Sequence, residues 1–209
     1  MSGGLDSAVL LARLLAGRGR IAPVYVQTGL RWEAVEVYWL RRLLRAVHSA
    51  AVAPLRVIQL PLRRVYGSHW SLSGRQVPSA RSRDAAVYLP ARNVLLATAA
   101  AIYCEPRGLS TIAFGTLKGN PFGDATPRFF STLSDSLTQA LRHPIRLVAP
   151  LRRLRKSDLI RSAGSWPLDL TFSCLQPQGR FHCGRCNKCA ERARAFREAD
   201  VADPTRYAV

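Results

Sequence analysis

The chain opens with the hexapeptide SGGLDS at residues 2–7, followed by the apolar run Ala8–Leu11. Two adjacent glycines allow a tight turn with exposed backbone N–H groups, the hydroxyls of Ser2 and Ser7 add donors, and the start of a helix adds its positive end. Such a loop predicts a cradle for pyrophosphate. The carboxylate of Asp6 would repel a phosphate directly, so we expect it to act through a Mg²⁺ bridge, with helix capping as the alternative.

A second group of reactive side chains lies near the other end of the chain, at Cys174, Cys183, Cys186 and Cys189. Four thiolates at this short spacing satisfy tetrahedral Zn²⁺ and leave no open position, which predicts a structural zinc site. An Fe–S cluster, disulfides or free thiols are the alternatives. His182 adjoins the cluster and is expected to flank it, while Cys104 falls on an apolar helix and is expected in the core.

Two basic residues stand at expected helix starts between these motifs. Arg92 follows Tyr88-Leu-Pro-Ala and opens a helix, where a guanidinium can clamp phosphate or carboxylate oxygens. Lys156 follows the last expected strand and could neutralise a leaving anion as a point charge. The alternatives are a capping or surface arginine and a solvated lysine. Asn93 is expected either to cap the Arg92 helix or to bind a ligand.

The elements that position these residues alternate between short β-branched runs and helical stretches. Strands are expected at 21–27, 55–60, 111–115 and 145–148, and helices at 32–47, 93–105, 128–141, 157–163 and 190–199. The helix at 93–105 is apolar almost all round, which predicts burial. The alternation predicts an α/β fold with a parallel sheet covered by helices on both faces. Ligands then bind beyond the carboxyl ends of the strands, as at Gly115. Residues 63–87 look irregular and are expected to form a flap or a surface excursion.

Composition excludes several classes of protein. The chain has 209 residues, of which 48% are hydrophobic, so a real core is expected and global disorder is not. No uncharged apolar run is long enough to span a membrane, and no secretory leader opens the sequence, so we expect a cytoplasmic protein. The net charge of +18 favours anionic partners. The arginines that supply this charge are spread along the chain. This distribution indicates a solvated surface or, as the alternative, a surface that binds nucleic acid.

The string SGGLDS resembles the signature of the PP-loop ATP pyrophosphatases, which cleave ATP between its α and β phosphates and adenylate a substrate on a Rossmann-like sheet. The resemblance implies that ATP is held by Ser2, Gly3, Gly4, Leu5, Asp6, Ser7 and Gly115. In that superfamily the loop follows a central strand, whereas only Met1 precedes Ser2 here. We therefore expect either a strand upstream of Met1 or a sheet that lacks it.

The tail closely resembles the C-terminus of the 7-cyano-7-deazaguanine synthase family. That family carries four zinc-binding cysteines in this spacing, then an arginine, an aromatic residue and an Asp-Pro-Thr-x-Tyr ending, which match Arg192, Phe196 and Asp203–Tyr207. The resemblance implies a PP-loop nucleotide-binding domain at residues 1–170 and a zinc-binding segment at 171–209. It also implies one structural Zn²⁺, a small-molecule substrate and a homodimer, with no nucleic-acid or membrane partner.

The implied reaction, in queuosine biosynthesis, uses ATP, Mg²⁺ and ammonia to convert 7-carboxy-7-deazaguanine to its nitrile through an acyl-adenylate and an amide. Asp6, Ser7, Lys156 and Arg92 would be catalytic. The loop at residues 116–128 departs from the family pattern, and Phe122, Asp124 and Arg128 are the expected substrate contacts there. This departure leaves open a relative with another acceptor, such as a protein amine. The net charge of +18 leaves open a tRNA-modifying PP-loop enzyme, and the missing first strand leaves open a non-catalytic nucleotide- and zinc-binding module.

Overall fold

Four short strands in the described part of the chain run parallel in two hydrogen-bonded pairs. The computed structural model describes residues 1–17 and 19–208. In it, β1 (Val24–Gln27) pairs with β2 (Arg56–Gln59), and β3 (Thr111–Ala113) pairs with β4 (Arg146–Val148). No backbone ladder joins the two pairs within those residues. The predicted α/β class and the parallel direction are confirmed, and each strand is shorter than the apolar run that predicted it.

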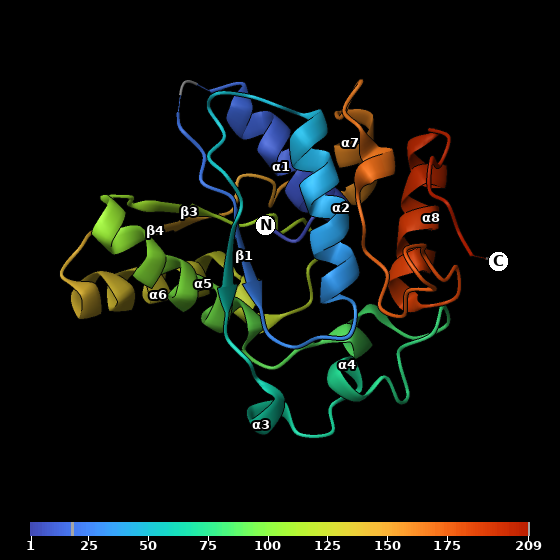
Figure 1. Ribbon diagram of the computed structural model, residues 1–209, viewed down its shortest axis with the longest axis horizontal. Coiled ribbons are helices and arrows are strands. Elements are labelled where there is room, and N and C mark those ends of the chain that lie inside the picture. The colour runs from blue at the N-terminus through green and yellow to red at the C-terminus, as the bar shows by residue number, and fades with distance from the viewer. Residues whose placement is uncertain (18, 209) are drawn as a thin grey trace.

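The N-terminal segment lies between the two strand pairs (Figure 1). The amino group of Met1 donates a hydrogen bond to the carbonyl oxygen of Val24, at the start of β1. On the other side, Gly115 follows β3 and approaches Asp6 so closely that a Cβ on Gly115 would lie 3.2 Å from the Asp6 carbonyl carbon. The SGGLDS loop is therefore flanked by backbone from both pairs.

The helices follow the predicted order, with two further short ones. They are α1 (Leu5–Leu15), α2 (Glu33–Ala46), α3 (Arg63–Tyr66), α4 (Trp70–Ser73), α5 (Arg92–Cys104), α6 (Pro127–Leu141), α7 (Lys156–Arg161) and α8 (Asn187–Ala199). The stretch at 63–87 is thus not wholly irregular, because it contains α3 and α4. Trp70 of α4 stacks on Trp32 with ring centroids 5.7 Å apart, and Ser71 is fully buried. Part of this stretch therefore packs against the body of the protein.

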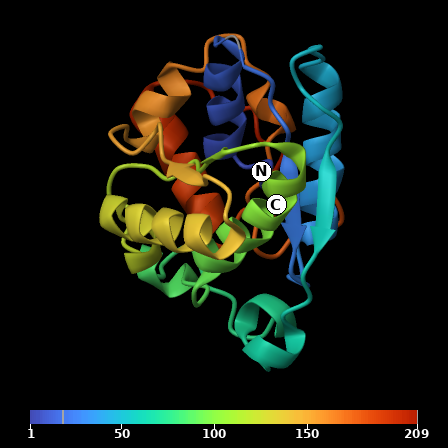
Figure 2. The ribbon, with the colours of Figure 1, turned by 90° about the vertical axis from the view of Figure 1, so that its left-hand side faces the viewer.

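The β3–β4 pair lies between two layers of helices (Figures 1 and 2). On one side, Ala97 and Ala101 of α5 and Phe130 of α6 share a core with Leu147 of β4. On the other side, a second core joins α1, α7 and α8; its buried members are Leu5, Val9, Leu10, Leu151, Leu159, Ile160, Leu168, Ala195, Phe196 and Ala199. The first helix, α1, therefore links the SGGLDS loop to the C-terminal helix α8.

The helix α5 is not buried all round, contrary to its composition. Ile102 is 58% exposed, while Ala97, Ala101 and Cys104 face the core. The small side chains of Ala97 and Ala101 lie in the core, while the bulkier Ile102 on another side of the helix is left in water. Cys104 lies in the core as predicted. Within residues 1–17 and 19–208, no helix has the length and apolar character that a bilayer crossing needs.

Candidate functional site

The SGGLDS loop turns sharply into α1. Gly3 has a φ of +76°, in the left-handed region that favours glycine, and Gly4 is extended. The Ser2 hydroxyl accepts from the Gly4 N–H at 3.3 Å and lies 3.2 Å from the Ser7 hydroxyl, which donates to the Gly4 carbonyl at 3.1 Å. Gly4 is the N-cap residue of α1, and no side-chain hydrogen bond caps the helix at this position. The first turn of the helix therefore keeps backbone N–H groups for an anion.

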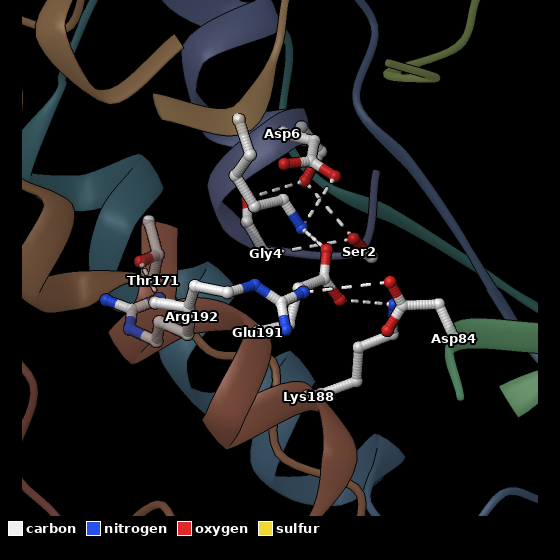
Figure 3. Close-up of polar contacts among 11 residues, drawn as sticks. Ser2, Gly4, Asp6, Asp84, Thr171, Lys188, Glu191 and Arg192 are labelled. Atoms are coloured by element: carbon white, nitrogen blue, oxygen red, sulfur yellow. Dashed lines mark hydrogen bonds and ion pairs between the residues drawn. The ribbon is translucent and has the colours of Figure 1, made fainter. Parts of the chain in front are cut away.

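Beside this loop, charged side chains from three helices form a chain of ion pairs. Lys156 Nζ lies 3.5 Å from the Asp6 carboxylate and also donates a hydrogen bond to Glu191. Glu191 in turn pairs with Lys188 at 2.6 Å. Figure 3 shows Glu191 reaching from α8 toward Asp6 and Ser2. The fold thus brings the start of α7 and the start of α8 to the SGGLDS loop.

Burial sets the charge state of this group of side chains. Burial raises the pKa of Asp6, although the charge of Lys156 opposes the shift. Burial also acts to lower the pKa of Lys156, but the carboxylates of Asp6 and Glu191 outweigh it, so the pKa of Lys156 is raised. For Glu191, burial is outweighed by the two lysines, and the pKa is lowered to about 2. At neutral pH Lys156 therefore carries its positive charge at the loop.

Two polar atoms at this site have no protein partner. Asp6 Oδ1 and Thr116 Oγ1 are buried without a hydrogen bond within the described part of the chain. Unsatisfied buried polar groups are costly, so a ligand or ion that supplied partners to these two atoms would be stabilised here. The uncapped start of α1, the Lys156 ammonium and these two atoms together fit a phosphate chain, and the free Asp6 oxygen could ligate a divalent cation.

Arg92 lies on the side of β1 and α2. It opens α5, as predicted, and its charge acts on Glu36, whose pKa is raised to about 7 by burial and only partly lowered again by Arg92. Glu36 accepts a hydrogen bond from the Tyr25 hydroxyl at 2.7 Å and also faces Glu33 and the terminal amino group. Arg92 is therefore close enough for its charge to act on Glu36 and on the Met1 amino group.

The three candidates for substrate contact have different surroundings. Asp124 is occupied: its carboxylate accepts from the Asn93 N–H at 2.9 Å, and its backbone carbonyl accepts from the Asn93 side chain at 3.0 Å. Phe122 packs against Tyr88 with centroids 5.3 Å apart. Arg128 is exposed on the first turn of α6. The structure thus brings Asp124 and Phe122 to the start of α5, while Asn93 is held by Asp124 instead of capping the helix with its own side chain.

The four predicted cysteines converge in the core. Their Sγ atoms lie within 4.8 Å of one another, with Cys174–Cys186 and Cys183–Cys189 at 4.0 Å and Cys186–Cys189 at 3.5 Å. Tetrahedral zinc with Zn–S bonds of about 2.3 Å separates sulfurs by about 3.8 Å. Backbone N–H groups of Leu175, Gln176 and Cys183 point at these sulfurs, and all four cysteines are free thiols. This arrangement fits a structural Zn²⁺.

His182 flanks the cluster, as expected. Burial lowers its pKa to about 3, so the ring is neutral, and its Nε2 accepts from the Ser173 N–H at 3.2 Å. The C-terminal segment packs around Arg192 of α8, which is buried with 1% of its surface exposed. Arg192 donates to Thr171 Oγ1 at 2.8 Å, to the Leu168 carbonyl at 3.0 Å and to Thr205. The Asp-Pro-Thr-x-Tyr ending therefore anchors α8 to the rest of the protein.

Sequence reasoning did not single out three charged residues of this region. Glu33 accepts from both Thr28 donors and from the Gly29 N–H at 2.7–2.8 Å, which fixes the turn after β1. Lys188 and Glu191 join the charge chain at Lys156. Their spacing of three residues on an expected helix was the available signal, but such spacing is common on solvated helix faces.

Comparison with known proteins agrees with this geometry. The model of the family described as "Queuosine biosynthesis protein QueC" matches residues 1–200. The 7-cyano-7-deazaguanine synthase of Anaeromyxobacter dehalogenans is 34% identical over 100% of this chain and 94% of its own length. The synthases of Methanococcus maripaludis and Myxococcus xanthus are 30% and 34% identical, over 100% and 99% of this chain and 97% and 95% of their own. The chain therefore belongs to the queuosine biosynthesis protein QueC family.

Proposed function

We propose that this protein is an ATP-dependent synthase that converts 7-carboxy-7-deazaguanine and ammonia to 7-cyano-7-deazaguanine. The full-length similarity to synthases of that name supports this activity over the alternatives of a protein-amine acceptor, a tRNA substrate or a non-catalytic module. The single observation that carries the chemistry is the juxtaposition of the uncapped α1 start with the Asp6–Lys156 pair.

In the proposed reaction a substrate carboxylate attacks the α-phosphate of ATP, and pyrophosphate leaves. The loop residues Ser2, Gly3, Gly4, Leu5, Asp6 and Ser7, with Gly115 behind them, would hold the phosphates, and Lys156 would stabilise the leaving charge. Ammonia then displaces AMP to form an amide. The amide oxygen attacks a second ATP and releases pyrophosphate, and loss of AMP, which carries that oxygen, together with the amide protons leaves the nitrile. Activation is needed because hydroxide is a poor leaving group; orientation supplies the remaining acceleration.

Several finer assignments belong to the same proposal. Mg²⁺ would bind at the free oxygen of Asp6, and Arg92 would contact the bound nucleotide or acid. Phe122 and Arg128 would face the deazapurine, with Asp124 shaping that wall. Residues 1–170 would form the nucleotide-binding domain, and residues 171–209 the zinc segment docked against it. A cytoplasmic location and a homodimer are proposed on the same basis.

To test this function, purified protein is incubated with ATP, Mg²⁺, ammonia and 7-carboxy-7-deazaguanine. The products are then identified by mass spectrometry. A nitrile with about two AMP per product is expected. AMP without a nitrile would favour another acceptor, and no AMP with any carboxylate would favour a binding module. Tight, salt-sensitive tRNA binding would favour the tRNA-modifying alternative.

Two variants test the assignment of the site. Asp6→Ala and Lys156→Ala should lose AMP formation while zinc content stays near one per chain. Arg161→Ala is the matched control, because Arg161 lies on the same helix as Lys156 with its side chain 49% exposed and paired to Asp158. Full activity in both site variants would overturn the assignment.

A further inference from the structure

Helix α8 contributes two charged side chains to the phosphate loop. Glu191 accepts from Lys156 through Oε1 and from Lys188 through Oε2, the latter at 2.6 Å. One carboxylate therefore holds two ammonium groups, one from the start of α7 and one from the start of α8. Figure 3 shows Lys188 and Glu191 on the same helix, with Glu191 directed at the loop.

This arrangement differs from an ordinary pair on a helix surface. The side chains of Glu191, Lys156 and Lys188 are only 18%, 21% and 30% exposed. A charge that has lost most of its water must be held by several partners. The pairing of Lys188 with Glu191 also continues, through Lys156, to Asp6 in the loop.

The donors that remain free distinguish the two lysines. An ammonium group has three N–H donors. Lys156 is engaged with Asp6 and Glu191, which leaves it one donor for an anion. Lys188 contacts only Glu191 among the carboxylates of residues 1–17 and 19–208, which leaves it two. Its charge is also close enough to lower the pKa of Asp6.

We propose that Lys188 is a second cation that contacts the pyrophosphate of the bound nucleotide, and that Glu191 is a positioning residue that holds Lys156 and Lys188 side by side. This inference rests on the proposed function of the loop. The ligand class is an inorganic or nucleotide-borne pyrophosphate, whose several oxygens can take the three unused donors together.

The cysteine cluster also holds the first turn of α8, which carries Lys188. Cys186 is the residue before α8, and Cys189 lies in its first turn, so Lys188 stands between two metal-ligand positions. A metal that orients these cysteines also orients Lys188. The cysteine cluster thereby supports the phosphate site directly, in addition to stabilising the tail.

The test titrates inorganic pyrophosphate into the zinc-loaded full-length protein by calorimetry. Lys188→Ala should weaken binding about 10-fold or more, the usual loss for a charge-assisted contact, and Lys188→Arg should restore part of it. Arg197→Ala is the matched control, because it removes one positive charge from an exposed position of the same helix. Its affinity should equal that of the wild type.

The Glu191→Gln variant tests whether Glu191 positions the ammonium groups of Lys156 and Lys188. It should weaken pyrophosphate binding about 10-fold in the wild-type background but change nothing further in a Lys156→Ala, Lys188→Ala background, with zinc content unchanged throughout. Wild-type affinity in Lys188→Ala, or tighter binding in Glu191→Gln, would overturn the inference. The proposed function fails separately, if the wild-type protein binds pyrophosphate but forms no AMP with the deazapurine acid.

Discussion

Replacing Gly3 by alanine should damage the phosphate loop through the backbone. Gly3 has a φ of +76°, and an added Cβ would lie 3.2 Å from the Cβ and 3.5 Å from the Cα of Leu40 on α2. Leu40 is completely buried, so it cannot swing away. The loop must therefore move by a few tenths of an ångström or adopt another backbone conformation.

The size of the effect follows from two contributions. A side chain in the left-handed region costs ~1–2 kcal/mol, and crowding against a packed core adds ~1 kcal/mol. The free energy of unfolding should fall by ~2–3 kcal/mol in total, which lowers the Tm by about 4–12 °C in a chain of this size. Displacement of the N–H groups that we propose bind the phosphates should reduce kcat/KM at least ~10-fold.

A matched variant separates strain from damage to the site. Gly108→Ala also places alanine at a positive φ, +62°, but its Cβ meets nothing within 4 Å. It should cost only the ~1–2 kcal/mol of backbone strain and leave activity unchanged. Thermal unfolding and pyrophosphate release are measured on both variants. A Gly3→Ala protein with wild-type activity, and with no more destabilisation than Gly108→Ala, would refute the reasoning.

Three further perturbations probe other parts of the structure. Burial raises the pKa of Glu36 from 4.5 to about 7, so below pH 7 the folded state binds a proton that the unfolded state has released. The free energy of unfolding should therefore fall by up to ~3 kcal/mol as the pH rises from 4.5 to 7, and Glu36→Gln should remove this slope in denaturant titrations. Asp124→Ala should lower stability by ~1–2 kcal/mol in thermal unfolding, because the Asn93 N–H loses its acceptor; an unchanged Tm would mean that the contact carries no stability. Cys186→Ser should reduce bound zinc in metal analysis and lower the Tm, and retention of full zinc and Tm would contradict the tetrathiolate site.

Local patterns were sufficient for part of this picture. Adjacent glycines between serines predict a turn with exposed N–H groups, because glycine alone adopts positive φ without cost. Short spacings between cysteines likewise predict convergence, because a few residues cannot separate their sulfurs widely. The helices that carry Lys156 and Arg92 begin within one residue of their predicted starts at 157 and 93.

In two segments the sequence left the pattern of burial ambiguous, and tertiary packing determined it. The composition of α5 predicts burial all round, yet Ile102 is 58% exposed while Ala97 and Ala101 lie in the core. Residues 63–87 lack a clear period, yet α4 packs through Trp70 on Trp32. In both segments, which side chains are buried depends on the elements that pack against them in the folded protein. A local sequence pattern contains no information about those elements.

The sequence by itself determined the loop, the cysteine cluster and the order of the elements, since each depends on residues close together in the chain. Only the tertiary structure decided that Lys156 and Glu191 meet beside Asp6, and that Asp124 is taken up by Asn93. These partners come from distant segments, and their pairing follows from how α1, α7 and α8 share one core. Spacing along a chain does not encode such distances, because they arise only when buried faces are packed together.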